Sequence, residues 1–173
     1  GNILDTKVYD SIIKTSRERH VDVIMATPPC QGISTAGQQI EGDERNSLTI
    51  PALHSIQDLE PKYAVLENVP GYLKTTIDYN GQLCLIPDII SDTLGDKYEI
   101  SFNVIDTADY GVPQVRERAI VLLSRKDQPV WELPSKSNRI VTMRDAIGNL
   151  PMIDPFIKDL DPTEFQRMFP KYE

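Results

Sequence analysis

One cysteine stands where a reactive thiol would be expected. Cys30 follows Pro28 and Pro29 and lies in a polar segment, residues 27–46, that contains three glycines. The two prolines favour an extended backbone, and an exposed loop thiol with cationic neighbours is the usual setting of a nucleophilic cysteine. The alternative is a structural cysteine that packs as a small apolar side chain. Cys84, inside an apolar stretch, fits that alternative.

Two further segments carry side chains that could act together with this thiol. Glu67 comes directly after the apolar run 64–66, so it is either a general acid in a partly buried setting or an ordinary strand-end residue. Gln114, Arg116 and Arg118 alternate along the chain, which would place them on one side of an extended segment. Arginines so placed can hold a phosphate or a base oxygen, or they can pair on the surface with the acidic residue between them.

These side chains need strands and helices that bring them together. Short apolar runs predict strands at residues 21–26, 63–66 and 118–123, and an alternating pattern predicts one at 98–105. Helical patterns occupy 47–59, 83–94 and 142–149. The alternation predicts an α/β fold with a largely parallel sheet, and such folds bind ligands beyond the carboxyl ends of their strands. Cys30 and Glu67 follow predicted strand ends. Arg118 opens its strand, so it reaches the same edge only if that strand runs antiparallel to its neighbours.

The composition is that of an acidic, single-domain chain. Its 173 residues carry 18 Lys and Arg against 26 Asp and Glu, a net charge of −8. This balance argues against a dedicated nucleic-acid-binding module, although residues 110–145 hold seven basic and four acidic residues. No apolar run approaches the roughly 18 residues of a membrane span, and no signal-peptide pattern opens the chain. We expect a protein that is not secreted, with reduced cysteines and no metal site.

The motifs, taken together and in order, resemble those of the cytosine-C5 DNA methyltransferases. The matching segments are Pro28-Pro29-Cys30-Gln31, Glu67-Asn68-Val69, Asp109-Tyr110-Gly111-Val112-Pro113, Gln114-Val115-Arg116-Glu117-Arg118 and Asp145-Ala146-Ile147-Gly148-Asn149-Leu150-Pro151. The resemblance implies that Cys30 attacks C6 of a cytosine flipped out of double-stranded DNA, and that C5 takes a methyl group from S-adenosyl-L-methionine. It further implies that Glu67 contacts N3 and the exocyclic amine, that Arg118 contacts O2, and that Arg116 contacts the DNA backbone.

The resemblance also assigns binding residues. Gln31, Ser34 and Gln114 would contact DNA. The residues that would line the cofactor pocket are Asn2, Ile3, Thr27, Pro29 and Leu48. Asn2 stands where the family usually has Asp, and its amide can still hydrogen-bond an adenine edge. A bacterial-type cytoplasmic protein with a restriction-modification role would be in keeping with the family.

The resemblance covers residues 1–151, the expected catalytic-core segment, and residues 152–173 would begin the connection to a target-recognition region. The family's Gly-rich cofactor loop, its recognition region and its last cofactor segment have no counterpart in the sequence. We therefore expect a partial Rossmann-like methyltransferase sheet, mostly parallel with one antiparallel strand and without its N-terminal strands. A second polypeptide or missing chain segments would supply the rest. Two alternatives stay open: a non-catalytic subunit or decayed fragment that binds a partner, and an RNA methyltransferase, against which Gln31-Gly32 argues.

Overall fold

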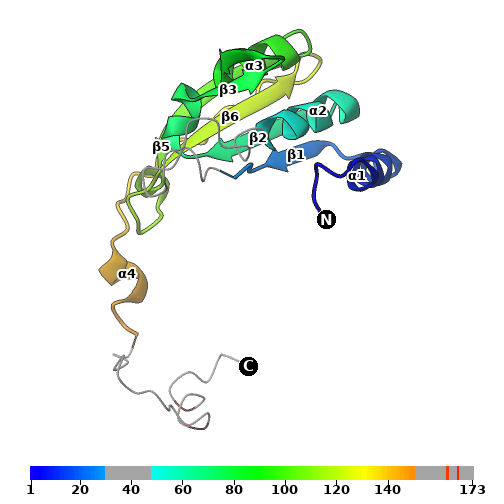
Figure 1. Cartoon of the computed structure of the whole chain (residues 1–173). Coiled ribbons are helices and arrows are strands. Elements are labelled where there is room, and N and C mark those ends of the chain that lie inside the picture. Colours follow the sequence, from blue (N-terminus) through cyan, green and yellow to red (C-terminus); the bar gives the residue numbers. More distant parts are fainter. Residues whose placement is uncertain (30–47, 151–162, 164–166, 168–173) are drawn as a thin grey trace.

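The computed structural model describes residues 1–29, 48–150, 163 and 167, and these form an α/β fold (Figure 1). Within them, one sheet has the strand order β1-β2-β6-β5, and a second pairs β3 with β4. The strands are β1 (Val23–Ala26), β2 (Tyr63–Asn68), β3 (Thr76–Tyr79), β4 (Gln82–Leu85), β5 (Tyr98–Asp106) and β6 (Glu117–Arg125). The helices are α1 (Thr6–Glu18), α2 (Thr49–Leu59), α3 (Ile86–Leu94) and α4 (Met143–Ile147), with 3-10 turns η2 (Pro70–Lys74) and η3 (Thr107–Tyr110).

The larger sheet has the strand directions that the sequence predicts. β1 and β2 pair in parallel, whereas β6 runs antiparallel to both of its neighbours, β2 and β5. Three strands therefore run one way and one runs the other. Because β6 is reversed, its first residues lie beside the last residues of β2, with Asn68 opposite Ala119 and Glu67 opposite Ile120. The carboxyl ends of β1 and β2 and the amino end of β6 thus lie at the same end of the sheet.

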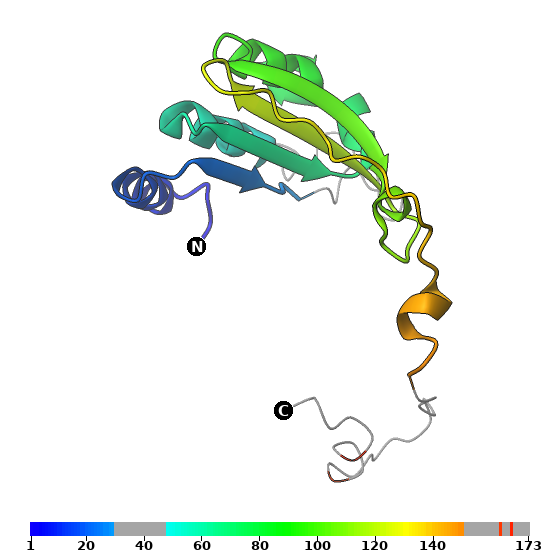
Figure 2. The ribbon, with the colours of Figure 1, turned by 180° about the vertical axis from the view of Figure 1, so that it is seen from behind.

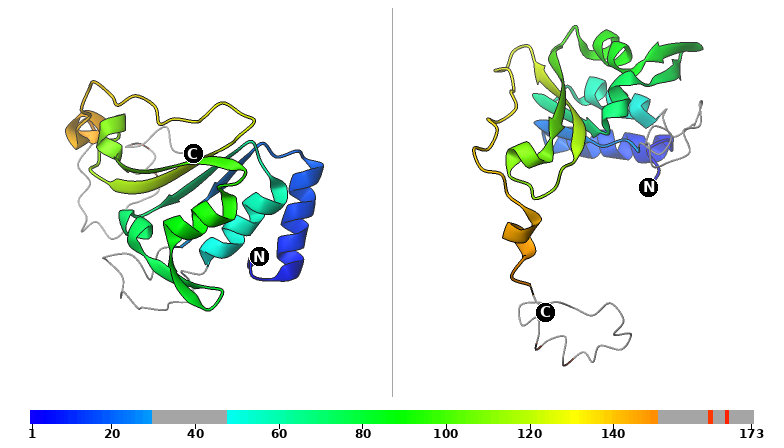
Figure 3. Two further views of the ribbon diagram at one scale, coloured as in Figure 1. Left: turned by 90° about the horizontal axis from the view of Figure 1, so that it is seen from above. Right: turned by 90° about the vertical axis from the view of Figure 1, so that its left-hand side faces the viewer.

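Helices α1, α2 and α3 lie side by side on one face of the sheet (Figure 3). α1 begins after Asp5, whose carboxylate caps the helix by accepting the backbone N–H of Lys7 at 2.9 Å. The core lies between α2, α3 and the two central strands. Its fully buried members include Leu53, Ile56, Ala64, Leu66, Ile89, Ile90, Val121 and Leu123. This packing fixes β2 and β6, the strands that carry Glu67 and Arg118.

The predicted helix over residues 83–94 is wrong at its start. Residues Gln82–Leu85 form β4, which pairs with β3 in a hairpin, and α3 begins only at Ile86. The hairpin turn is Asn80-Gly81, with φ angles of 56° and 79°, and this dipeptide is favoured in two-residue turns because both positions need positive φ. A short apolar run fits a strand and a helix equally well, so the turn decides between them. Cys84 lies half-buried against the core, as predicted for a structural cysteine.

An extended strap, residues 129–141, crosses the face of the sheet opposite the helices (Figure 2). The indole of Trp131 stacks on the ring of Tyr63 with the centroids 4.4 Å apart. Farther along, the ammonium of Lys136 lies 2.6 Å from a carboxylate oxygen of Asp109. The strap is therefore fastened near both ends of the sheet, and α4 projects beyond it, away from the sheet (Figure 1).

Candidate functional site

Glu67 and Arg118 form an ion pair at the end of the sheet where β2 finishes and β6 begins. Glu67 is the penultimate residue of β2 and Arg118 the second residue of β6, so the antiparallel pairing of these strands brings together groups 51 positions apart. Arg118 Nε lies 2.9 Å from Glu67 Oε1, and the two side chains are 16% and 35% exposed, respectively. A second guanidinium nitrogen of Arg118 donates to the carbonyl of Glu117 at 2.6 Å. The guanidinium is thus held from two sides in a partly dehydrated position.

Asn68 is a further functional candidate. It is part of the Glu67-Asn68-Val69 motif, but the sequence alone assigns it no role of its own. Its side chain is buried, with 4% of the residue exposed, and its amide nitrogen donates to the carbonyl of Pro28 at 2.9 Å. Its amide oxygen accepts the backbone N–H of Val69, also at 2.9 Å. Asn68 therefore ties the segment that follows β1 to the end of β2, one residue from Glu67. The sequence held a signal for this role: an amide at position 68 shares one face of the strand with the apolar residues Ala64 and Leu66.

Gln114 and Arg116 lie just before β6, which begins at Glu117. They lie in the loop of residues 107–116 between β5 and β6, and both are exposed. The backbone of this loop is hydrogen-bonded to its own base, where Thr107 N–H donates to the Arg116 carbonyl at 3.0 Å. Only Arg118 of the three alternating residues is part of a strand.

A largely apolar cavity of about 460 Å³ opens beside β1. Four of the five predicted cofactor residues line it, namely Ile3, Thr27, Pro29 and Leu48. Further lining comes from β1, α1 and α2, through residues such as Met25, Ile12 and Ala52. Asn2 is not among the lining residues, and its amide oxygen accepts the backbone N–H of Leu4 at 3.1 Å.

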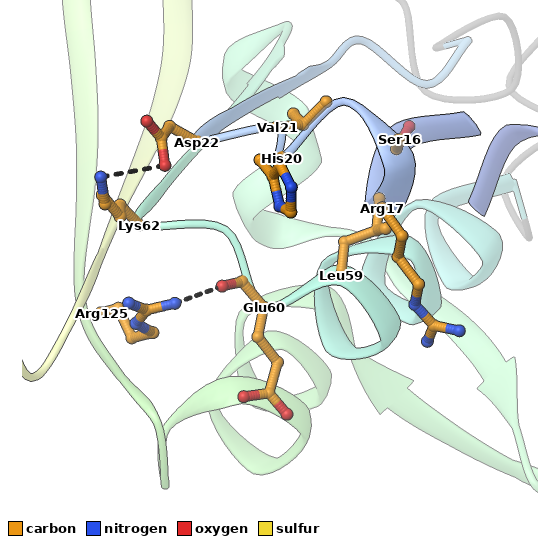
Figure 4. Close-up of a pocket in the computed structure, with 9 residues that line it drawn as sticks. All are labelled: Ser16, Arg17, His20, Val21, Asp22, Leu59, Glu60, Lys62 and Arg125. Carbon is orange, nitrogen blue, oxygen red and sulfur yellow. Dashed lines mark hydrogen bonds and ion pairs between the residues drawn. The ribbon is translucent and has the colours of Figure 1, made fainter. Parts of the chain in front are cut away.

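A smaller, polar cavity of about 290 Å³ lies at the opposite end of the sheet (Figure 4). It is lined by Ser16, Arg17, His20, Val21, Asp22, Leu59, Glu60, Lys62 and Arg125. Lys62 pairs with Asp22 at 3.1 Å, and Arg125 donates to the Glu60 carbonyl at 2.6 Å. Hydrogen bonds from Arg125 hold the pKa of Asp127 at about 2, well below its ordinary value. None of the predicted site residues lies in this cavity.

Three predicted residues, Cys30, Gln31 and Ser34, lie outside the described residues. Pro29, which immediately precedes Cys30 in the chain, is described and lines the apolar cavity. Among the residues that the structure describes, no group of His, Cys, Asp and Glu is placed to hold a metal ion. The helices in that same part of the chain are too short and too polar to cross a membrane.

A family model of C-5 cytosine-specific DNA methylases matches residues 4–168. The chain belongs to this family. The type II methyltransferase M1.HgaI of Avibacterium volantium is 40% identical over 159 residues, which are 89% of this chain and 44% of that protein. M.XorII of Xanthomonas oryzae pv. oryzae is 34% identical over 141 residues, 80% of this chain and 32% of that protein. The chain thus spans less than half the length of these relatives.

Solved structures of methyltransferases share the fold of this chain. The crystal structure of a protein assigned as a prophage-encoded DNA modification methyltransferase (E. coli) superposes with a TM-score of 0.65 at 25% identity, over 88% of this chain and 42% of that one. The methyltransferase EhMeth of Entamoeba histolytica shares the fold, with a TM-score of 0.56 at 21% identity, over 82% of this chain and 42% of that one.

Proposed function

We propose that this chain carries the nucleophile and the base-binding side chains of an enzyme that methylates cytosine at C5 in DNA. The observation that carries the proposal is the contact between Glu67 and Arg118, beside the segment that Asn68 ties to Pro28. N3 and O2 are neighbouring positions of the cytosine ring, so a carboxylate and a guanidinium that touch each other can address both. The target ring must leave the base stack to reach them.

Cys30 is the proposed nucleophile. Its thiolate forms a bond to C6, the electron pair of the C5–C6 double bond shifts to the C4–C5 bond, and the C4–N3 pair shifts to N3, so that C5 becomes the nucleophilic carbon of an enamine. Bound S-adenosyl-L-methionine supplies the methyl group that C5 takes up. Transfer of the C5 proton to a base and expulsion of the Cys30 thiolate then restore the double bond.

Arg118 and Glu67 act on the ring while its charge changes. Negative charge reaches O2 as the thiolate adds, and the guanidinium of Arg118 stabilises it from a position already fixed by Glu67 and the Glu117 carbonyl. Such preorganised groups are effective because they need no rearrangement during the reaction. Glu67 contacts N3 and the exocyclic amine. The exposed side chain of Arg116 contacts the DNA backbone.

The remaining DNA contacts of the proposal come from three glutamine and serine side chains, Gln31, Ser34 and Gln114. Of these, Gln114 is described, and its side chain is exposed in the loop that also carries Arg116. A polar side chain in that position can bond a phosphate oxygen, which fixes the register of the DNA without reading its sequence.

The apolar cavity beside β1 fits the cofactor. Its volume of about 460 Å³ falls in the range of about 300–1,000 Å³ that is usual for small-molecule sites. Ile3, Pro29 and Leu48 offer apolar surface to an adenine ring, and Thr27 offers a hydroxyl group. Pro29 lines the cavity and is the residue directly before Cys30 in the sequence. A methyl donor bound there would thus contact the chain one residue before the proposed nucleophile.

Further polypeptide is part of the proposal. Within the described residues β1 is the outermost strand of its sheet and pairs on one side, with β2. The backbone on its other side can pair with another strand. We place the catalytic core in residues 1–151 and the start of a connection to a target-recognition region in residues 152–173, in a cytoplasmic restriction-modification enzyme.

Methyl transfer tests the proposal. The chain and its Cys30→Ser variant are given labelled S-adenosyl-L-methionine with mixed-sequence duplex DNA or RNA. Each is assayed alone and with the segments of M1.HgaI that lie outside the matched region. We expect Cys30-dependent label in DNA once these segments are present. Label in RNA instead would favour the RNA-modifying alternative, and no transfer under any condition would favour a non-catalytic subunit.

A further inference from the structure

The loop of residues 107–116 presents two exposed polar side chains at the site. Gln114 and Arg116 are both exposed, yet each backbone is bonded to the start of the loop. An exposed ten-residue connection is ordinarily mobile, and each residue ordered only upon binding weakens the complex. The bonds that hold this loop are therefore relevant to its function.

Asp106, the last residue of β5, makes the central bonds. Its Oδ1 accepts the backbone N–H of Ala108 at 3.0 Å and that of Arg116, also at 3.0 Å. One carboxylate oxygen thus joins the first turn of the loop to its last residue. Hydrogen bonds to a charged acceptor are stronger than bonds between neutral groups.

Thr107 adds a second pair of bonds beside the first. Its hydroxyl donates to the carbonyl of Gln114 at 2.9 Å, and its N–H donates to the carbonyl of Arg116 at 3.0 Å. The backbone at 114–116 is therefore fixed on several sides, whereas the side chains of Gln114 and Arg116 are exposed. No ion pair holds the Arg116 guanidinium within the described part of the chain.

We propose that Asp106 is a positioning residue that holds Arg116 in place for the DNA backbone. The inference rests on the proposed function, because that function assigns the phosphate contact to Arg116. Asp106 itself touches neither base nor nucleophile. It acts through the backbone of Arg116, two residues before Arg118, so the same bond also fixes where β6 begins.

Three variants separate this role from general stability. Asp106→Ala removes the acceptor, whereas Asp106→Asn keeps a side-chain oxygen that accepts the same two N–H groups. Asp78→Ala is the matched control, since Asp78 Oδ1 accepts the N–H of Gly81 at 3.0 Å in the hairpin turn of β3 and β4. Arg116→Ala and the double variant Asp106→Ala/Arg116→Ala complete a cycle.

Two measurements are made on each variant, together with its melting temperature. One is the hydrogen exchange of the Arg116 amide, which needs no DNA. The other is affinity for mixed-sequence duplex DNA as a function of salt. We expect Asp106→Ala to expose the Arg116 amide and to weaken DNA binding about tenfold, as when one or two residues must be ordered on binding. Its salt slope should stay near that of the parent, because Arg116 still reaches the phosphate once it is ordered, whereas Arg116→Ala should lower the slope by about one.

The pattern across variants decides the proposal. Asp106→Asn should bind DNA within about twofold of the parent, Asp78→Ala should bind as the parent does, and the double variant should be no weaker than Arg116→Ala. The proposed role of Asp106 would be overturned if hydrogen exchange of the Arg116 amide were unchanged in Asp106→Ala. It would also be overturned if the losses of DNA affinity of the two single variants added up in the double variant. Arg116→Ala could bind DNA as well as the parent although Asp106→Ala exposes the Arg116 amide to exchange. In that case the phosphate contact assigned to Arg116 in the proposed function is wrong, and Asp106 orders the loop without a role in DNA binding. Cys30-dependent methyl transfer is tested separately.

Discussion

The two ends of the sheet carry the same kinds of charged groups in different surroundings. At the carboxyl end of β2, Glu67 pairs with Arg118 at 2.9 Å, and the arginine is 16% exposed. At the other end, Lys62 pairs with Asp22 at 3.1 Å, and these side chains are 45% and 62% exposed. Water and salt therefore screen the second pair more strongly than the first.

This difference shows why ion pairs alone do not locate a site. The exposed pairs around the polar cavity satisfy one another and line a surface that has no link to any predicted motif (Figure 4). The pair of Glu67 and Arg118 stands beside a buried amide, an apolar cavity and a loop that carries the exposed Arg116. Partial burial lowers the effective dielectric around the pair, so its charges would act more strongly on a bound ring than the exposed charges at the other end could.

The largest expected contrast between the two ends is in catalysis. Glu67→Gln should lower methyl transfer by about 10²-fold or more, the usual cost of losing one preorganised polar group. Asp22→Asn, which removes the carboxylate of the exposed pair, should leave the rate unchanged. Transfer rates under single-turnover conditions, with the remaining segments supplied, measure both. Equal rates for the two variants would remove the functional distinction between the ends.

Loss of a buried bond should be felt next most strongly. Asn68→Ala leaves the Pro28 carbonyl and the Val69 N–H without their partner. We expect the free energy of unfolding in urea to fall by about 1–3 kcal/mol. Gln57→Ala is the matched control, because the exposed Gln57 amide also donates to a backbone carbonyl, that of Thr93 at 3.2 Å. A loss in that control as large as in Asn68→Ala would show that burial is not the cause.

The strap connects the two ends, so releasing one end tests whether they act independently. Trp131→Ala removes the stack on Tyr63 and should cost about 0.5–1.5 kcal/mol beyond the area it exposes, while Trp131→Phe should recover part of that. Because Lys136 and Ser137 still hold the strap to Asp109, DNA binding should stay near that of the parent. A loss of DNA binding in Trp131→Ala would mean that the ends are coupled.

The single tryptophan of the chain gives this experiment a direct readout. Stacked on Tyr63 and 37% exposed, the indole should shift its emission to longer wavelength when the strap is released. Tyr63→Ala should produce that shift without removing the fluorophore. An unchanged emission in Tyr63→Ala would contradict the stacked arrangement.

The smallest effect is expected from the exposed pair of Asp127 and Arg125. Two hydrogen bonds from the guanidinium, of 2.6 and 3.0 Å, lower the pKa of Asp127 from 3.8 to about 2. A depressed pKa in the folded state adds stability above pH 3.8, and this contribution fades as the pH falls toward 2. Arg125→Gln should return the pKa to its ordinary range, as read from the carboxyl resonance. A resonance that titrates near pH 3.8 in the parent would contradict the pairing.

Periodicity and turn residues predicted the central strands well and the flanking elements less well. β2, β5 and β6 contain the expected segments, and β1 falls within its own, because these strands are either apolar runs or, in β5, an alternation of apolar and polar residues. Helix α1 is absent from the sequence-based assignments, since Thr6–Glu18 is polar on most of its surface and has Ile13 as its buried residue. The β3–β4 hairpin was overlooked because the Asn80-Gly81 turn was outweighed by the apolar run that follows it.

The family and the types of groups at the site, a thiol, a carboxylate and arginines in a fixed order, follow from the amino-acid sequence. The sequence also required β6 to be antiparallel if Arg118 was to reach Glu67, and the structure confirms this. The contact between these two groups, the bond from Asn68 to Pro28 and the bond from Arg116 to Asp106 are known from the folded structure. Each of these contacts joins residues ten or more positions apart, and local pattern carries no information on such distances, because packing and strand register set them.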